Sequence, residues 1–389
     1  MSALALLPST LLPSALLPSP ALQHRLCRIA RAVVGSLAVV SAAVGGSALA
    51  ATWVYVANAD SQDISVLALD RERGALLPVQ TVNVGGTVMP MVVSPDKRVL
   101  HAALRSQPFR VTSLAIDAAT GRLQKIGEAS LADSMANIDL DASGRWLFAA
   151  SYGGGKISVN AIGKDGAAGA VQQLIQTGPN AHAIHADATN RFVLATSLGA
   201  DQVSSWRFDA DKGLLSPNDP ALTTTPPRSG PRHFVWSPTQ RHVYLLDELD
   251  AALHVFAWDG ARGTLKLEQS HTTLPAGFTG KPWAADLHLT PDGRYLYASE
   301  RTSSTLSTFR VDTATGQLQP LGQTPTEKGP RGFAIDPQGR FLIVAGQESH
   351  SVSLYTIDAA TGALGTPVRL AVGKNPNWIE IVDFPQAAQ

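Results

Sequence analysis

The sequence predicts an all-β protein, a seven-bladed β-propeller with four-stranded antiparallel blades. Three observations support this fold class. A short turn followed by an apolar strand recurs at nearly regular spacing, alternating strands lie between the copies, and the strands at the two chain ends complement each other.

The recurring turn places an arginine directly before an apolar strand. Successive arginines are 46 to 53 residues apart, at Arg98, Arg145, Arg191, Arg241, Arg294 and Arg340. A period near 50 with strand-like content is typical of propeller blades rather than helical repeats. Several copies contain Pro-Asp or Asp-Gly, which are hairpin residues, so we interpret the turn as structural.

Each copy resolves into four strands, which we name A to D from the channel outward. Strand A precedes the turn, as in 138–140, and strand B follows it, as in 243–246. Strand C alternates apolar and polar residues, as in 352–355, and an outer strand D follows, as in 265–268. Alternation with a period of two indicates half-buried strands.

The two chain ends predict how the ring closes. Strand C occurs seven times, near residues 64, 109, 157, 203, 253, 306 and 352. The N-terminal blade begins with a B strand at 54–57, and a seventh A strand occurs only at 378–382. We expect these two strands to pair, because pairing removes both free edges. A closed ring needs no partner at an edge, so we expect a monomer with one propeller domain over 51–389.

Residues 1–50 differ from the rest and are predicted to be a leader. Three Leu-Leu-Pro-Ser copies precede a cluster of Arg25, Arg28 and Arg31, and residues 32–51 carry no charge. Ala48-Leu49-Ala50 has the small-x-small pattern of a signal-peptidase site. We expect a periplasmic or secreted protein without stable membrane association after cleavage. An uncleaved anchor, or a mis-assigned start of a cytoplasmic protein, are the alternatives.

Composition excludes several classes of function. Lys+Arg and Asp+Glu both number 31, so the net charge gives no electrostatic case for nucleic acid. Cys27 is the only cysteine, which excludes a disulfide framework and a cysteine metal site. No His-x-x-x-His motif or carboxylate cluster at ligand spacing supports a metal. We therefore expect no metal site.

Antiparallel pairing brings the start of strand A and the end of strand B to one end of the channel, which we call the mouth. The residues around the start of strand A include Asn137, His182, Arg232, Trp283, Asp286, Arg331 and Asn377. Those at the end of strand B are Asn58, Arg105, Tyr152, Glu248, Arg301 and Gln347. Several arginines with few acids favour an anionic small molecule, because guanidinium groups bind phosphate and carboxylate bidentately. A single loop arginine is usually solvated, so the prediction rests on the clustering. His185, His233 and His288 lie within strand patterns and receive no role.

Several long motifs resemble the propeller-type 6-phosphogluconolactonase family, which includes the carboxymuconate-cyclising enzymes. They are Met89–Arg98, Gly230–His233, Asn377-Trp378 and the longest, Trp283–Thr302, and the resemblance covers about residues 52–383. It implies a catalytic set of His182, Arg232, Glu248 and Arg301, all of which belong to the mouth. Arg331, Trp283, Asp286 and Asn377 are the candidate substrate-binding residues. Ser299-Glu300 departs from the Asp expected beside the arginine.

The resemblance implies a carboxylic ester hydrolase that converts 6-phospho-D-glucono-1,5-lactone to 6-phosphogluconate without a cofactor. Glu248 or His182 is expected to activate water while Arg232 and Arg301 hold charge. The leader conflicts with a cytoplasmic sugar phosphate, so an exported lactonase for unphosphorylated lactones is one alternative. The others are a cycloisomerase and a non-enzymatic binding propeller.

Overall fold

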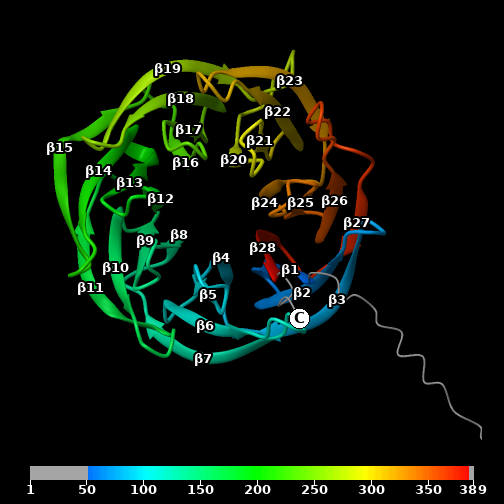
Figure 1. Cartoon of the computed structure of the whole chain (residues 1–389), viewed down its shortest axis with the longest axis horizontal. Helices are drawn as coiled ribbons and strands as arrows, with labels where there is room; N and C mark the ends of the chain where they lie inside the picture. The colour runs from blue at the N-terminus through cyan, green and yellow to red at the C-terminus, as the bar shows by residue number, and fades with distance from the viewer. Residues whose placement is uncertain (1–50, 385–389) are drawn as a thin grey trace, which may run out of the picture. The chain divides into compact units, whose positions relative to one another are not determined.

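The computed structural model describes residues 51–384 as seven four-stranded antiparallel sheets. Figure 1 shows these sheets as blades around a central channel. The fold class and the blade count predicted from the sequence are confirmed. The predicted leader lies outside the described residues. No helix within 51–384 is long and apolar enough to cross a membrane.

Each blade contributes one strand to each of four concentric positions. The innermost strands are β28 (Pro376–Phe384), β4 (Val88–Val93), β8 (Met135–Leu140), β12 (Ala181–Ala186), β16 (Pro231–Trp236), β20 (Ala284–Leu289) and β24 (Pro330–Ile335). The second strands are β1 (Ala51–Asn58), β5 (Val99–Leu104), β9 (Trp146–Ser151), β13 (Phe192–Ser197), β17 (His242–Asp247), β21 (Tyr295–Glu300) and β25 (Phe341–Gly346). The third strands are β2 (Asp63–Asp70), β6 (Arg110–Ile116), β10 (Lys156–Ile162), β14 (Gln202–Asp209), β18 (Ala252–Asp259), β22 (Thr305–Val311) and β26 (Ser351–Thr356). The outer strands are β3 (Ala75–Asn83), β7 (Leu123–Ser130), β11 (Ala168–Gln176), β15 (Leu214–Thr224), β19 (Thr264–Thr272), β23 (Leu318–Pro325) and β27 (Val368–Ala371); a 3₁₀ turn, η2 (Leu198–Ala200), follows β13.

The ring closes as predicted, because β28 pairs with β1 in an antiparallel register that places Val56 opposite Ile379. Arg71 reinforces this closure. Its guanidinium donates to Asp336 at 2.8 Å and to Asp383 at 2.7 Å. The closing strand is thereby tied to the first and the last blade.

The hydrophobic core lies between the facing sheets of neighbouring blades. One cluster joins Val54 and Leu67 of the first blade to Phe341 and Leu354 of the last. Comparable clusters fill the spaces between the other blades. Because each blade buries its faces against its two neighbours, the ring keeps the inner strands in fixed positions around the channel.

The recurring turn has a physical explanation at its first residue. Asp187 accepts hydrogen bonds from the backbone N–H groups of Arg191 at 2.9 Å and Phe192 at 2.8 Å. Asp336 does the same, and the hydroxyls of Ser94 and Ser237 accept from the corresponding groups. A short acceptor at this position satisfies buried donors as the chain enters strand B.

We predict that Asp187→Ala lowers the free energy of unfolding by about 3 kcal/mol, because it leaves buried N–H groups without their charged acceptor. Asp187→Ser is the matched control. It restores the acceptor found in other blades and should recover most of the loss. Urea unfolding of the two variants measures the difference, and equal stability of wild type and Asp187→Ala would contradict the explanation.

Candidate active site

A register shift in the strand pairing at the mouth orients the candidate side chains. In all seven blades the pairing between the first and second strands shifts register at the mouth end. The shifted segments contain His182, Arg232, Asp286, Arg331 and Asn377. Bulges reorient side chains beside active sites, so the same backbone device positions each of these residues.

Glu248 lies between two arginines at the centre of the site. Its Oε2 atom accepts from Arg232 Nε at 2.8 Å and from Arg301 Nη2 at 2.8 Å. Burial alone would raise the pKa of Glu248, but the two guanidinium groups outweigh burial and lower it. Glu248 is therefore a charged carboxylate that orients arginines, and it is a weak proton acceptor.

Backbone carbonyls at the start of β20, and that of Trp283 just before it, fix both arginines. Arg301 donates to the carbonyls of Trp283 and Ala284, both at 3.0 Å, and Arg232 donates to the carbonyl of Ala285. The Arg301 guanidinium lies 3.8 Å from the centre of the Trp283 ring, a cation–π contact. Glu300 accepts from the Trp283 N–H at 2.6 Å, so this departure from the family pattern holds the segment in place.

Positive charge exceeds negative charge at the mouth. The pKa of Arg331 lies well below its ordinary value because of burial and of the nearby guanidinium groups of Arg232, Arg301 and Arg105. Burial and Arg232 likewise lower the pKa of Arg301 to about 9, so Arg301 stays charged at neutral pH. A bound anion would relieve this repulsion, so the site suits an anionic ligand.

Arg331 is the arginine best placed to bind such an anion. Within residues 51–384 its guanidinium has no hydrogen-bond partner, whereas Arg105 donates to Ser134 at 2.9 Å. A planar guanidinium group whose N–H donors are free can form two parallel hydrogen bonds to a phosphate or carboxylate.

His182 is buried and uncharged beside this cluster. Its ring centre lies 5.0 Å from that of His233 and 5.9 Å from that of Tyr152. Burial first, and then the charge of Arg232, hold the pKa of His182 well below its ordinary value. A neutral imidazole has a lone pair, so His182 can accept a proton at neutral pH.

The remaining predicted residues have different surroundings. Trp283 is 46% exposed and covers Arg301. The amide of Asn377 donates to the carbonyls of Ala57 and Val88. Asp286 accepts from the backbone N–H of Phe333 in the next blade at 3.3 Å. These contacts give Asn377 and Asp286 a role in joining strands, and substrate binding by them stays a prediction.

Two residues without an assigned role also belong to this region. Arg105 belongs to the predicted mouth but not to the predicted substrate-binding set. His233 has no role predicted from the sequence, because it lies within a strand pattern, but it adjoins both His182 and Asp286. The Gly230–His233 motif contained the only signal for it. Among residues 51–384 no group of three or more metal-ligating side chains gathers, and chemistry without a cofactor stays a prediction.

A closed propeller with an arginine-rich mouth and a buried neutral histidine is suited to a small anionic ligand and to proton transfer. The family described as "Lactonase, 7-bladed beta-propeller" matches residues 50–381. The chain belongs to this lactonase family.

Similar proteins support this assignment. The 6-phosphogluconolactonase of Pectobacterium carotovorum subsp. carotovorum (strain PC1) is 43% identical over 329 residues, which cover 85% of this chain and 98% of that protein. The 6-phosphogluconolactonase of Serratia proteamaculans (strain 568) is 41% identical with the same coverage. The periplasmic gluconolactonase of Pseudomonas aeruginosa has a similar structure, with a TM-score of 0.81, 31% identity and coverage of 86% of this chain and 100% of that chain.

We predict that inorganic phosphate binds at the mouth and that Arg331→Gln raises its dissociation constant about tenfold, the loss expected when one charge-assisted contact is removed. Isothermal titration calorimetry measures both constants. Arg294→Gln is the control, because Arg294 is exposed and pairs with Asp292 in a turn. Equal phosphate affinity in wild type and Arg331→Gln would show that Arg331 does not hold the anion.

Proposed function

We propose that this protein hydrolyses 6-phospho-D-glucono-1,5-lactone to 6-phosphogluconate. The observation that carries the proposal is the excess of arginines around the buried Arg232–Glu248–Arg301 group. Relatives named 6-phosphogluconolactonase at about 40% identity support the same reaction. The phosphate gives the arginines an anion to hold during lactone opening.

Each charged or titratable side chain of the site has a separate role in the reaction. Water attacks the lactone carbonyl carbon, and neutral His182 accepts a proton from it. Arg232 and Arg301 stabilise the negative charge that develops on the carbonyl oxygen, because Glu248 and β20 hold them in place beforehand. The bond from the carbonyl carbon to the ring oxygen then breaks, and that oxygen takes the proton to become a hydroxyl. Arg331 and Arg105 hold the phosphate.

We assign proton acceptance to His182 because its ring is neutral and keeps a lone pair, whereas Glu248 holds two arginines. Two arginines already neutralise the Glu248 carboxylate and lower its pKa. His182 lacks such a partner, since its Nδ1 atom has no hydrogen-bond partner in the described chain. We therefore assign the base to His182 and the orientation of the arginines to Glu248.

A second candidate function is hydrolysis of unphosphorylated sugar lactones outside the cytoplasm. The structural similarity to a periplasmic gluconolactonase favours it, as does the leader-like sequence at residues 1–50. We propose that these residues export the enzyme. Detection of the chain in periplasmic extract, without residues 1–50, would support export, and an intact chain in the cytoplasm would oppose it.

We predict that the purified protein prefers the phosphorylated lactone over gluconolactone by about a hundredfold in kcat/KM, since two arginine contacts contribute about 3 kcal/mol. Proton release from fresh lactones, corrected for spontaneous hydrolysis, measures the ratio. Arg331→Gln should reduce it, and Arg294→Gln should not. An equal or reversed preference would favour the unphosphorylated lactones instead.

We predict that His182→Ala lowers kcat at least a hundredfold, the usual contribution of general base catalysis. Wild-type activity should stay constant from pH 8 to 6.5, because the lowered pKa keeps His182 unprotonated throughout that range. The pH dependence of kcat/KM tests this. Full activity in both His182→Ala and Glu248→Gln would contradict the site assignment.

A further inference from the structure

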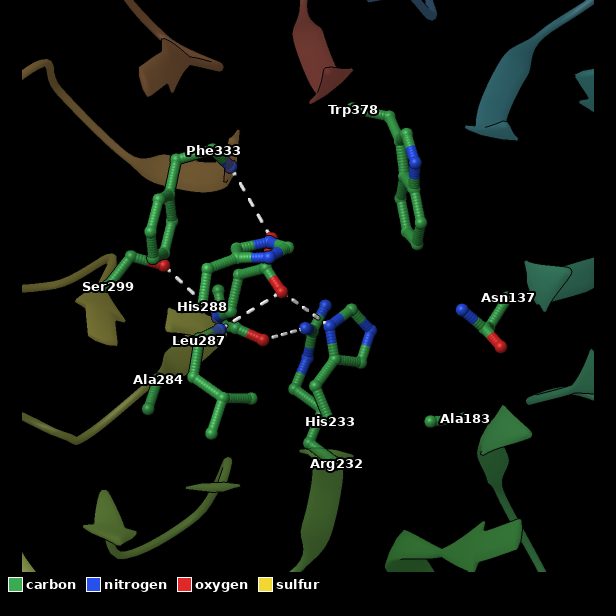
Figure 2. A network of polar contacts seen from close by, with 12 residues as sticks. Asn137, Ala183, Arg232, His233, Ala284, Leu287, His288, Ser299, Phe333 and Trp378 are labelled. Atoms are coloured by element: carbon green, nitrogen blue, oxygen red, sulfur yellow. Dashed lines mark hydrogen bonds and ion pairs between the residues drawn. The ribbon is translucent and has the colours of Figure 1, made fainter. Parts of the chain in front are cut away.

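A buried carboxylate lies directly below the mouth and binds a histidine beside His182. Asp286 Oδ1 accepts from His233 Nδ1 at 2.8 Å and from the Leu287 N–H at 3.0 Å. Its Oδ2 accepts from His288 Nε2 at 3.1 Å and from the Phe333 N–H at 3.3 Å. The second contact is the dashed line that starts at Phe333 in Figure 2. Because both oxygens are engaged, Asp286 is held rigidly and can orient His233.

The contact with Asp286 fixes where the proton of His233 resides. A charged carboxylate only accepts hydrogen bonds, and His233 together with His288 holds the pKa of Asp286 well below its ordinary value despite burial. Nδ1 of His233 therefore carries hydrogen. Burial lowers the pKa of His233 to about 4, so the ring is neutral and its lone pair lies on Nε2.

Two buried nitrogens on neighbouring rings lack partners. They are Nε2 of His233 and Nδ1 of His182, neither of which has a hydrogen-bond partner in the described chain. The two ring centres are 5.0 Å apart and the ring planes are inclined by 65°. An unpaired buried nitrogen is costly, and an acceptor on His233 complements a donor on His182. A small ring rotation or one bridging water would satisfy both atoms.

We propose that Asp286 and His233 are positioning residues that make His182 the proton acceptor, an inference that rests on the proposed function. The free acceptor on His233 favours hydrogen on Nδ1 of His182. The lone pair of His182 then lies on Nε2, the nitrogen left to face the substrate. A hydrogen bond from Nδ1 of His182 to Nε2 of His233 would complete a line from Asp286 in the channel to His182 at the mouth.

The surplus of arginines explains why this line is needed. His182 faces Arg232, His233, Arg331, Arg301 and Tyr152, and the guanidinium charges oppose its protonation. Glu248 already pairs with two arginines. Asp286 thus supplies, through His233, the negative charge that stabilises protonated His182.

The proton balance follows from this arrangement. Attack by water forms a carbon–oxygen bond at the lactone carbonyl, and the proton moves to Nε2 of His182 while its Nδ1–H donates toward His233. When the ring carbon–oxygen bond breaks, the same proton passes from His182 to the departing oxygen. His182 ends neutral, and no further reactant is required.

A second histidine–aspartate pair in the channel provides a matched control. His185 Nδ1 lies 2.8 Å from Asp139 Oδ2, the same distance as in the His233–Asp286 pair. Both pairs line a channel cavity of about 430 Å³. The ring of His185 packs against Phe234 instead of His182.

We expect Asp286→Asn to lower kcat ten- to a hundredfold with KM changed less than twofold, and Asp139→Asn to leave both within twofold of wild type. Because Asp286 acts through His182, the double variant His182→Ala/Asp286→Asn should be no slower than His182→Ala alone. A stability defect would instead slow the double variant further. If Asp286→Asn fails to fold, His233→Gln replaces it in the same double-mutant comparison with His182→Ala. The Gln side chain keeps a hydrogen-bond donor to Asp286.

The tautomer of His182 tests the positioning without any activity. In ¹⁵N-histidine-labelled protein we expect Nδ1 of His182 to carry hydrogen in wild type, and this preference to weaken in Asp286→Asn but not in Asp139→Asn. Hydrogen on Nε2 of wild-type His182, or fully multiplicative losses in the double variant, would overturn the inference. An inactive wild type whose His182 carries hydrogen on Nδ1 would refute the proposed function and leave the positioning supported.

Discussion

The pairing of β28 with β1 is the interaction on which the rest of the structure depends. It places the last strand of the chain in the first blade, and Arg71 ties that strand to Asp336 and Asp383. Only a closed ring brings seven inner strands around one channel. The register shifts at the mouth end of those strands then present side chains from separate blades to a common site.

The sign of the charge changes along the channel axis, from positive at the mouth to negative in the cavity below. This change determines where an anionic substrate can bind. The mouth contains Arg105, Arg331 and the two arginines that pair with Glu248. The cavity below is lined by Asp139, Asp286 and Glu380, and burial raises the pKa of Glu380 to about 7 despite its contact with Trp378. An anionic substrate is attracted to the mouth and repelled by the carboxylates below. His182 adjoins the arginines on one side and His233 on the other. Its proton affinity therefore depends on the positive charge of the mouth and on the negative charge of the carboxylates below.

The sequence was sufficient for the architecture because propeller blades repeat at a readable period. The first blade begins with its B strand at 54–57 and lacks an A strand, and the extra A strand at 378–382 therefore also revealed ring closure. Arg232, Glu248 and Arg301 were predicted together because antiparallel pairing forces the start of one strand and the end of the next to the same end.

The finer geometry was less accessible from the sequence. Alternation assumes a regular strand, so it gave no sign of the register shifts that turn Arg232 and His233 toward different neighbours. The contacts of Asp286 and Asn377 extend to adjacent blades, and one blade's sequence does not contain that information. The role of Glu300 in fixing Trp283 depends in the same way on a hydrogen bond between separated residues.

A crystal structure with 6-phosphogluconate tests the central claim most directly, because it shows where each end of the product lies. We predict the phosphate at Arg331 and Arg105, with the new carboxylate beside His182 and Arg301. Product bound in the lower channel near Asp139 and Glu380, or with its phosphate directed away from the arginines, would show that the arginines do not hold the phosphate.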